Sequence, residues 1–181
     1  MTESIAAFHA VRLTLLFLES EDRLLLLAAN GNGAQEGLVL TRRLTARLIN
    51  GLAALLERSN VAASTAPEDL KNDIVLMEHQ GALAGTEAAS SETAGKAAVM
   101  PENSMARIPQ RLVNTVNIKT NPADFHIVLQ APGGVPVATA MNRLDLHRLV
   151  ELLKRKSETA GWNLQIDAAW LGDDHAEFTI N

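Results

Sequence analysis

The feature that most constrains the fold of this 181-residue chain is a pattern of elements that occurs twice. Three stretches of the first half align with three of the second: Val11–Asp22 with Val113–Asp124, Arg23–Gly31 with Phe125–Gly133 and, after a slip of one residue, Thr41–Leu52 with Asn142–Leu153. Self-similarity of this kind indicates two units of the same build. The sequence therefore predicts an α+β fold of two pseudo-symmetric β-β-β-α units, each an antiparallel meander followed by a helix.

The first unit is expected to contain three strands and one helix. Polar turns at Glu19–Asp22 and Asn30–Gly33 separate short apolar runs, which is the signal of hairpins. Thr41 is the predicted N-cap of a helix with a broad apolar stripe, and Gly51 inside that stripe predicts close backbone packing. The three predicted strands are Arg12–Leu18, Arg23–Ala29 and Gly37–Leu40.

The second unit repeats this plan with a different distribution of apolar residues. Its predicted strands are Val113–Thr120, Phe125–Gln130 and Val137–Met141, followed by a helix that Asn142 caps and Gly161 ends. Apolar and polar residues largely alternate in Phe125–Gln130, which is typical of a sheet with one face in water. The strand Arg23–Ala29 is apolar on both faces, so it needs a cover from this chain or from another subunit.

The predicted organisation is a first unit (1–60), an acidic connector (61–106) and a second unit (107–181), within one compact domain. A helix is expected at 67–83, capped by Ser64 or Thr65, with Leu70, Ile74, Met77 and Gly81 on its inner side. Residues 85–105 lack an apolar period and are predicted to be flexible. Leu164–Trp170 alternates like a half-buried strand, so a C-terminal β-hairpin with Glu177–Ile180 is also expected.

Composition argues against several classes of protein. The absence of cysteine removes disulfides and thiolate chemistry. Aromatic residues make up 3% of the chain. Both units are neutral, with six basic and six acidic residues in 1–60 and eight of each in 106–181. Both features argue against nucleic-acid binding. No signal peptide and no apolar run of about 18 residues is found, which predicts a cytoplasmic protein without membrane contact.

Motifs of catalysis and metal binding are incomplete. The glycines at Gly31–Gly33 lie between two predicted strands, so they predict a hairpin turn rather than a phosphate loop. Glu78–His79 lacks the second histidine of a zinc-protease helix, and the five histidines show no ligand spacing. We therefore expect no metal, no cofactor and no catalytic residue.

Arginines cluster where the first helix begins. Arg42, Arg43 and Arg47 lie there, matched in part by Arg143 and Arg148 in the second unit. Positive charge near a helix N-terminus is unfavourable for the helix dipole, so local stabilisation does not explain it. Two interpretations stay open: a repeated site for an anion or an acidic partner, and ordinary solvated helix surface, which is the commoner case.

These observations favour a non-enzymatic protein–protein interaction or assembly module that associates as a homo-oligomer, with a further protein partner as an option. The alternative is a small-ligand-binding protein or enzyme that uses the cleft between the two units. Nucleic-acid binding through the arginines is the weakest hypothesis. The candidate ligand-binding residues are Arg42, Arg47, His126, Arg143, His147 and Arg148.

Overall fold

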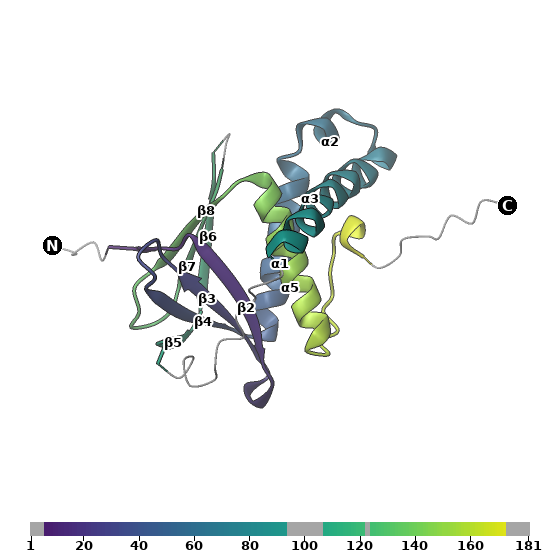
Figure 1. Ribbon diagram of the computed structural model, residues 1–181. Coiled ribbons are helices and arrows are strands. Elements are labelled where there is room, and N and C mark those ends of the chain that lie inside the picture. Colours follow the sequence, from purple (N-terminus) through teal and green to yellow (C-terminus); the bar gives the residue numbers. More distant parts are fainter. Residues whose placement is uncertain (1–5, 94–106, 122–123, 173–181) are drawn as a thin grey trace.

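The computed structural model describes residues 6–93, 107–121 and 124–172. It is an α+β structure in which two four-stranded sheets lie on one side and the long helices on the other (Figure 1). None of the helices in these described ranges is long and apolar enough to cross a membrane.

The first sheet contains the first predicted meander. Its strand order is β2–β3–β4–β5, antiparallel from β2 to β4 and parallel between β4 and β5. The strands are β2 (Arg12–Leu18), β3 (Arg23–Ala29), β4 (Gln35–Leu40) and β5 (Gln110–Leu112). Between β3 and β4, Asn30 Oδ1 accepts hydrogen bonds from the N–H groups of Asn32 and Ala34 at 3.0 and 2.9 Å. The glycine loop is therefore a hairpin turn, as predicted.

The second sheet contains the second predicted meander. Its order is β1–β8–β7–β6, antiparallel except for the parallel pair of β1 and β8. The strands are β1 (Phe8–His9), β6 (Thr115–Thr120), β7 (Phe125–Gln130) and β8 (Val137–Met141). Each sheet thus takes a short strand from the segment that precedes the meander of the other sheet. This exchange of β1 and β5 joins the two sheets, a question that the sequence left open.

Two capped helices follow the meanders. Helix α1 (Arg42–Arg58) begins after Thr41, whose Oγ1 accepts a hydrogen bond from the Leu44 N–H at 3.1 Å. Helix α5 (Arg143–Thr159) begins after Asn142, whose Oδ1 accepts from the Asp145 N–H at 2.8 Å. Gly161, with a φ of 68°, follows the last turn of α5 and permits the left-handed conformation there. Both caps and this stop were predicted.

The core lies between the inner faces of the sheets and these two helices. It contains Leu24 and Leu26 of β3, Ile127 and Leu129 of β7, and the apolar stripes of α1 and α5. Each fully buried leucine or isoleucine contributes about 1.5–3 kcal/mol of transfer free energy. The stripes of the two helices are Leu48, Ile49, Leu52 and Leu56, and Leu146, Leu149, Val150 and Leu153.

The outer faces of the two sheets differ as the sequence predicted. On β7, His126 and Gln130 are exposed, whereas Phe125, Ile127 and Leu129 are buried. On β3, Leu25 and Leu27 are 0% and 4% exposed and form a second apolar cluster with Val39, against which Leu16, Leu18 and Ile108 pack. The apolar outer face of β3 is therefore buried within the single chain.

The connector contains a longer helix than predicted. After α2 (Val61–Thr65), which Asn60 caps, and a 3-10 turn η2 (Glu68–Leu70), helix α3 runs over Lys71–Thr93. Ser64 and Thr65 lie inside α2 and do not cap α3, and residues 85–93 are helical rather than flexible. Residues 94–105 of the predicted flexible segment lie outside the described ranges.

The buried face of α3 also differs from the prediction. Val75, His79 and Ala82 are buried, whereas Leu70 is 46% exposed, Met77 is 71% exposed and Gly81 is exposed. The sequence predicts an inner side made of apolar residues and leaves open whether His79 lies on the surface or is a hydrogen-bonded interior histidine. The face of α3 that becomes buried is set by the contact of His79 with α5.

The predicted strand Leu164–Trp170 is wrong. Residues 163–168 are extended and their side chains alternate between exposed and at least half-buried, but they pair with no described strand and lead into the 3-10 turn η4 (Ala169–Leu171). Asn50 of α1 holds them, because its Nδ2 donates to the Gln165 carbonyl and its Oδ1 accepts from the Asp167 N–H, both at 3.0 Å. The alternation of side chains in this segment arises because it packs against α1 and not because it belongs to a sheet. Glu177–Ile180, the other half of the predicted hairpin, lies outside the described ranges.

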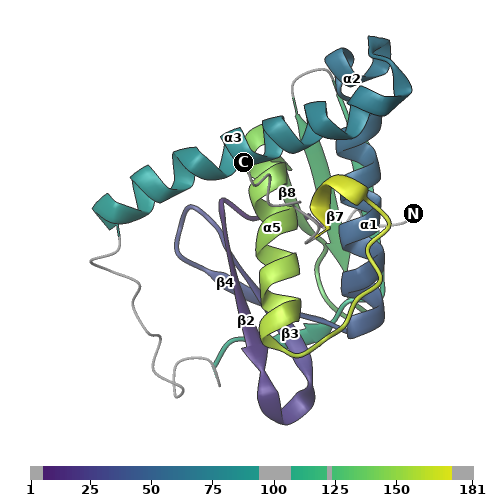
Figure 2. The same ribbon diagram turned by 90° about the vertical axis from the view of Figure 1, so that its right-hand side faces the viewer.

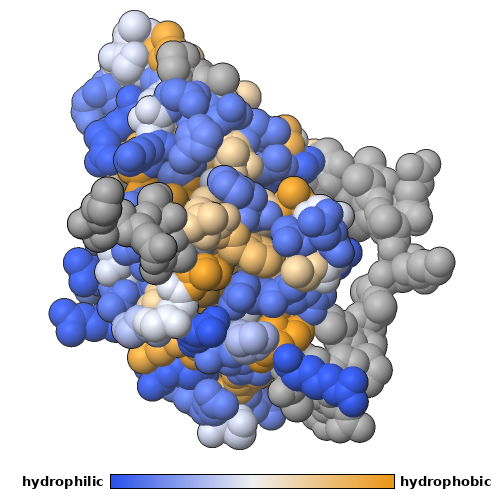
Figure 3. Space-filling model, turned by 90° about the vertical axis from the view of Figure 1, so that its left-hand side faces the viewer, coloured by the Kyte–Doolittle hydropathy of each residue, from blue (hydrophilic) through white to orange (hydrophobic). Residues whose placement is uncertain are grey.

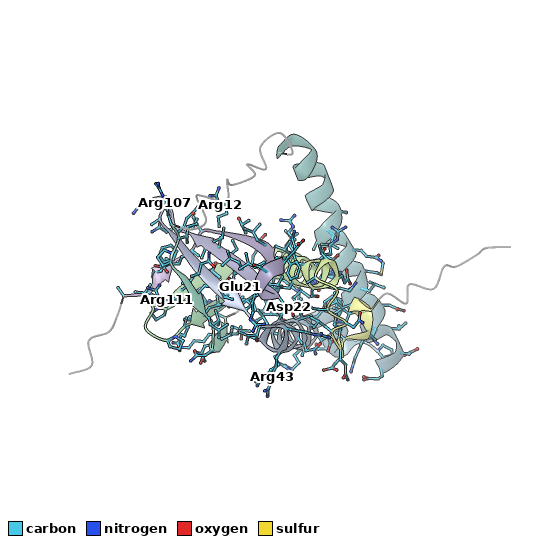
Figure 4. All side chains as sticks on the ribbon, turned by 90° about the horizontal axis from the view of Figure 1, so that it is seen from below. Arg12, Glu21, Asp22, Arg43, Arg107 and Arg111 are labelled. Carbon is cyan, nitrogen blue, oxygen red and sulfur yellow. The ribbon has the colours of Figure 1, made fainter. Side chains whose placement is uncertain are left out.

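A tryptophan fixes the start of this extended segment. Trp162 is 4% exposed, and its indole Nε1 donates to Asp22 Oδ1 at 2.5 Å in the β2–β3 turn, where Figure 4 labels Asp22. The segment then passes along α1 and α5 on the helical side of the molecule (Figure 2). Trp162 is thus a packing anchor, as the sequence suggested.

Candidate functional site

Five titratable side chains meet where α3 crosses α5. We call Glu78 and His79 of α3, with Arg143, His147 and Glu151 of α5, the histidine cluster. Residues four apart on a helix share one face, so 143, 147 and 151 all point toward α3. The two histidines are 5% and 0% exposed, and their Nδ1 atoms lie 3.2 Å apart.

Arg143 joins three helices at this crossing. Its Nη2 donates to Glu78 Oε2 at 2.8 Å and to the Leu56 carbonyl of α1 at 2.6 Å, and its Nε pairs with Glu78 Oε1. Its Nη1 donates to Ser59 Oγ at 2.6 Å, and Asn60 Nδ2 donates to Glu78 Oε2 at 2.8 Å. The guanidinium therefore satisfies a carbonyl at the end of α1 and a carboxylate of α3 together.

The pKa values of the two carboxylates of the cluster are both lowered. Burial raises the pKa of Glu78, but the hydrogen bond and charge of Arg143 outweigh burial, and the pKa lies below its ordinary value. The hydrogen bond from His79 lowers the pKa of Glu151 against the opposing effect of burial. His79 Nε2 and Glu151 Oε2 are 3.4 Å apart. Each buried imidazole thus has a carboxylate beside it.

His147 is neutral in the folded protein. Burial lowers its pKa to about 4, although the nearby carboxylate of Glu78 opposes this effect. The His147 Nε2 lies 3.4 Å from Glu78 Oε2 without the alignment of a hydrogen bond. Because the Nδ1 atoms of the two rings face each other, one must donate and the other accept. Protonation of both Nδ1 atoms would set two N–H groups against each other.

Trp170 of η4 closes the histidine cluster. Its ring meets His79 and His147 edge to face, with centroids 5.1 and 5.7 Å away, and its Nε1 donates to Glu57 Oε1 at 2.8 Å. Within the described residues, no three histidine or acidic side chains are placed to hold a metal ion. Both imidazoles are buried, and the contacts of the histidine cluster connect α3 and α5 with the end of α1.

The structure distributes the six predicted site residues over separate regions. Arg143 and His147 belong to the histidine cluster, and Arg148 beside it donates to the Ala82 carbonyl at 3.2 Å. Arg42 and Arg47 lie on α1, and His126 lies on the outer face of its sheet. The six residues therefore share no common cleft. The sequence predicts no site at Glu78–His79, an incomplete zinc motif, and none at Glu151 or Trp170, although the spacing of Arg143, His147 and Glu151 marks one helix face.

An open groove lies between α1 and β6. Its volume is about 360 Å³, and it is lined by Leu44, Arg47, Leu48, Gly51, Asn114, Thr115, Val116 and Ile118. Leu44, Leu48, Val116 and Ile118 give it an apolar floor, and no carboxylate lines it. We call this feature the α1–β6 groove.

One wall of the groove is a free sheet edge. Among the described residues, strand β6 is the last strand of its sheet and pairs only with β7, so one row of its backbone N–H and C=O groups faces away from the sheet. The other long edge strand, β2, packs against α5. A six-residue edge with a groove beside it is therefore a particular property of β6 among the long strands described.

Gly51 keeps the groove open on the helix side. A Cβ atom at this position would meet no atom within 4 Å, and the residue is exposed. The prediction of close backbone packing at Gly51 is wrong. The missing side chain leaves space at the groove instead.

A second hollow lies on the outer face of the β1–β8–β7–β6 sheet. Its volume is about 540 Å³, and His9, Val11, His126, Val128, Ala138 and Ala140 are among its lining residues. Seen from the sheet side, the surface is mostly hydrophilic with hydrophobic residues gathered across its middle (Figure 3). The edge strand at this hollow, β1, is only two residues long, and the other strands under it are paired on both sides, so the hollow offers mainly side chains.

Comparison with known proteins gives no further guide to function. No family model, no curated protein and no solved structure matches this chain.

Proposed function

We propose that this protein is a non-enzymatic protein–protein interaction module that binds an extended segment of a partner along the free edge of β6. One observation carries the proposal: the edge strand and the α1–β6 groove lie side by side. A segment added to β6 would form backbone hydrogen bonds with its unpaired groups. Alternate side chains would then enter the groove.

The dimensions of the groove support this mode of binding. Its volume of about 360 Å³ falls within the usual range of binding pockets. Helix residues 44–51 and strand residues 114–118 border it, so an extended segment would contact both walls over about four residues. The backbone bonds would supply affinity, and the apolar floor would select side chains.

The first test is a selection of heptapeptides displayed on phage against the full chain, with Gly51→Leu and Gly51→Ala as matched variants. Leucine would fill the groove, whereas alanine adds one methyl group in open space. We expect the selected peptides to bind wild type and Gly51→Ala, and to lose at least tenfold in affinity for Gly51→Leu. Equal binding to all three proteins would contradict the proposal.

Backbone pairing has a signature of its own. N-methylation of a selected peptide at successive residues should weaken binding at every second position, because only alternate N–H groups of an added strand face β6. The amide resonances of residues 115–120 should shift on binding. Uniform tolerance of N-methylation would argue for a side-chain contact instead of strand addition.

Self-association is a second proposal, and it now needs a different surface. Its sequence argument was the apolar outer face of β3, which is buried within one chain, with Leu25 0% exposed. The free edge of β6 is the surface that supports pairing of two copies. Sedimentation velocity of wild type and Gly51→Leu tests this: a dimer that the variant loses supports pairing at β6, and a monomer at all concentrations contradicts it.

Internal duplication is also a proposal. The orders β2–β3–β4–α1 and β6–β7–β8–α5 support it, together with the caps Thr41 and Asn142 and the exchange of β1 and β5. Two expectations stay predictions from the sequence: a small-ligand-binding protein or enzyme that uses the cleft between the units, and the cytoplasmic location.

A further inference from the structure

We infer that the segment that binds the α1–β6 groove is acidic. Its carboxylates form ion pairs with Arg47 and with Arg43, one helical turn earlier. This inference rests on the proposed function. Arg47 lines the groove and is exposed. Arg43 is exposed on the same helix, and Figure 4 shows it projecting away from α1.

The two arginines differ from those with partners elsewhere in the chain. Arg111, Arg143, Arg148 and Arg155 each have a carboxylate within 4 Å, supplied by Glu36, Glu78, Asp145 and Glu151. Neither Arg43 nor Arg47 has an ion-pair partner among the described residues. Their charge is therefore available to a ligand.

Local stability does not account for these arginines. Cations in the first turns of a helix oppose its dipole, and α1 has no acidic residue in its first turn. Helix α5, in contrast, carries Asp145 there, paired with Arg148 at 3.3 Å. The positive charge at the start of α1 lacks the local compensation found in α5.

Spacing fits an extended ligand. Arg43 and Arg47 are separated by about 6 Å along the helix axis, because each residue of an α-helix rises 1.5 Å. Residues i and i+2 of a strand point to the same side and are about 6.6 Å apart. Two carboxylates at alternate positions of one bound strand would therefore match the two guanidiniums.

The two possible occupants of the groove, an acidic partner and a second copy of this chain, differ in the charge that they would bring to the arginines. Strand β6 has the sequence TVNIKT, which contains Lys119 and no carboxylate. Pairing of two β6 edges would bring a lysine, rather than an acid, toward the arginines of the other copy. The overall charge of −5 has less influence, because the Debye length is about 8 Å at physiological salt. The local charge therefore favours an acidic segment of a different protein.

The experiment repeats the heptapeptide selection on wild type, on Arg43→Glu/Arg47→Glu and on Arg58→Glu. Arg58 is exposed on the same helix away from the groove and is the matched control. Wild type and Arg58→Glu should enrich peptides with aspartate or glutamate at alternate positions, and the double variant should enrich lysine and arginine there. Replacement of the acids in a selected peptide by amides should weaken its binding about tenfold, less at high salt.

The outcomes separate the partner from the proposed function. Enrichment of neutral or basic peptides by wild type, with binding still lost in Gly51→Leu, overturns the acidic partner and leaves the module intact. The same peptides from wild type and the double variant also overturn it. Failure of wild type to enrich any peptide over Gly51→Leu overturns both proposals.

Discussion

Arg143 and Arg47 both project from long helices, but their surroundings are opposite. Arg143 bonds to the side chains of Glu78 and Ser59 and to the Leu56 carbonyl. Arg47 faces an open groove without a carboxylate. A charged side chain that pairs with other residues of the chain holds helices together. A charged side chain without such a partner can bind a ligand of opposite charge. Changes in the histidine cluster should therefore alter stability, and charge changes in the groove should alter binding.

The largest loss of stability is expected from Arg143→Ala. The change leaves the Glu78 carboxylate partly buried beside His147 and removes hydrogen bonds to two other groups, so the free energy of unfolding should fall by about 3 kcal/mol. Urea unfolding measures this. Arg155→Ala is the control, because that side chain is 75% exposed and its pair should contribute less than about 1 kcal/mol.

Peptide binding completes this test. At low urea, where Arg143→Ala is still folded, its affinity for a groove-selected peptide should equal that of wild type. A loss of binding at full folding would show that the histidine cluster and the α1–β6 groove are coupled, and the comparison above would be wrong.

Acid should weaken the histidine cluster in a defined window. The pKa of His147 is lowered from 6.5 to about 4, so between these values the unfolded chain binds more protons than the folded chain. Stability from this residue is present above about pH 6.5 and is lost as the pH falls toward 4, by up to about 3 kcal/mol. The lowered pKa values of Glu78 and Glu151 add a further loss below 4.5.

Urea unfolding as a function of pH tests this assignment. His147→Gln should remove most of the slope between pH 6.5 and 4.5, whatever its stability at pH 7.5. His126→Gln, which removes an exposed histidine from β7, is the matched control. An unchanged slope in His147→Gln would show that another group titrates in this window.

Much of the fold could be predicted because its signals are local. The bounds of β2, β3, β7 and β8 agree with the apolar runs between turns, and Thr41 and Asn142 mark the starts of α1 and α5. In contrast, β1 and β5 are two and three residues long and pair with strands that are distant in sequence. Such strands have no period of their own, so the chain gives no local signal for them.

The candidate site could be predicted only in part, for the same reason. His147 and Arg143 attracted attention as polar residues on one helix, but His79 lies 68 residues away and becomes buried only when α3 crosses α5. The α1–β6 groove depends on which strand forms the sheet edge. The sequence predicts a candidate role for Arg47 from its charge, but it predicts close packing at Gly51, where the structure has open space.

Two neighbouring residues of α1 give the finest test of the comparison. Asn50 faces the extended segment 163–168 and forms hydrogen bonds with the Gln165 carbonyl and the Asp167 N–H, whereas Gly51 faces the groove. Asn50→Ala loses two hydrogen bonds, about 1–2 kcal/mol, and regains about 0.6 kcal/mol of helix propensity. The net loss should be about 0.5–1.5 kcal/mol in urea unfolding. No loss would mean that residues 163–168 are held by packing alone.

Gly51→Ala should change stability in the opposite direction and by a similar or smaller amount. Alanine is favoured over glycine in a helix by up to about 1 kcal/mol, and its Cβ would meet nothing within 4 Å, so the free energy of unfolding should rise by about 0.5–1 kcal/mol. If alanine at this position stabilises the helix without a steric clash, the packing of the fold does not require glycine there. If Gly51→Ala were destabilising, Gly51 would be needed for packing, and the groove would be closed in solution.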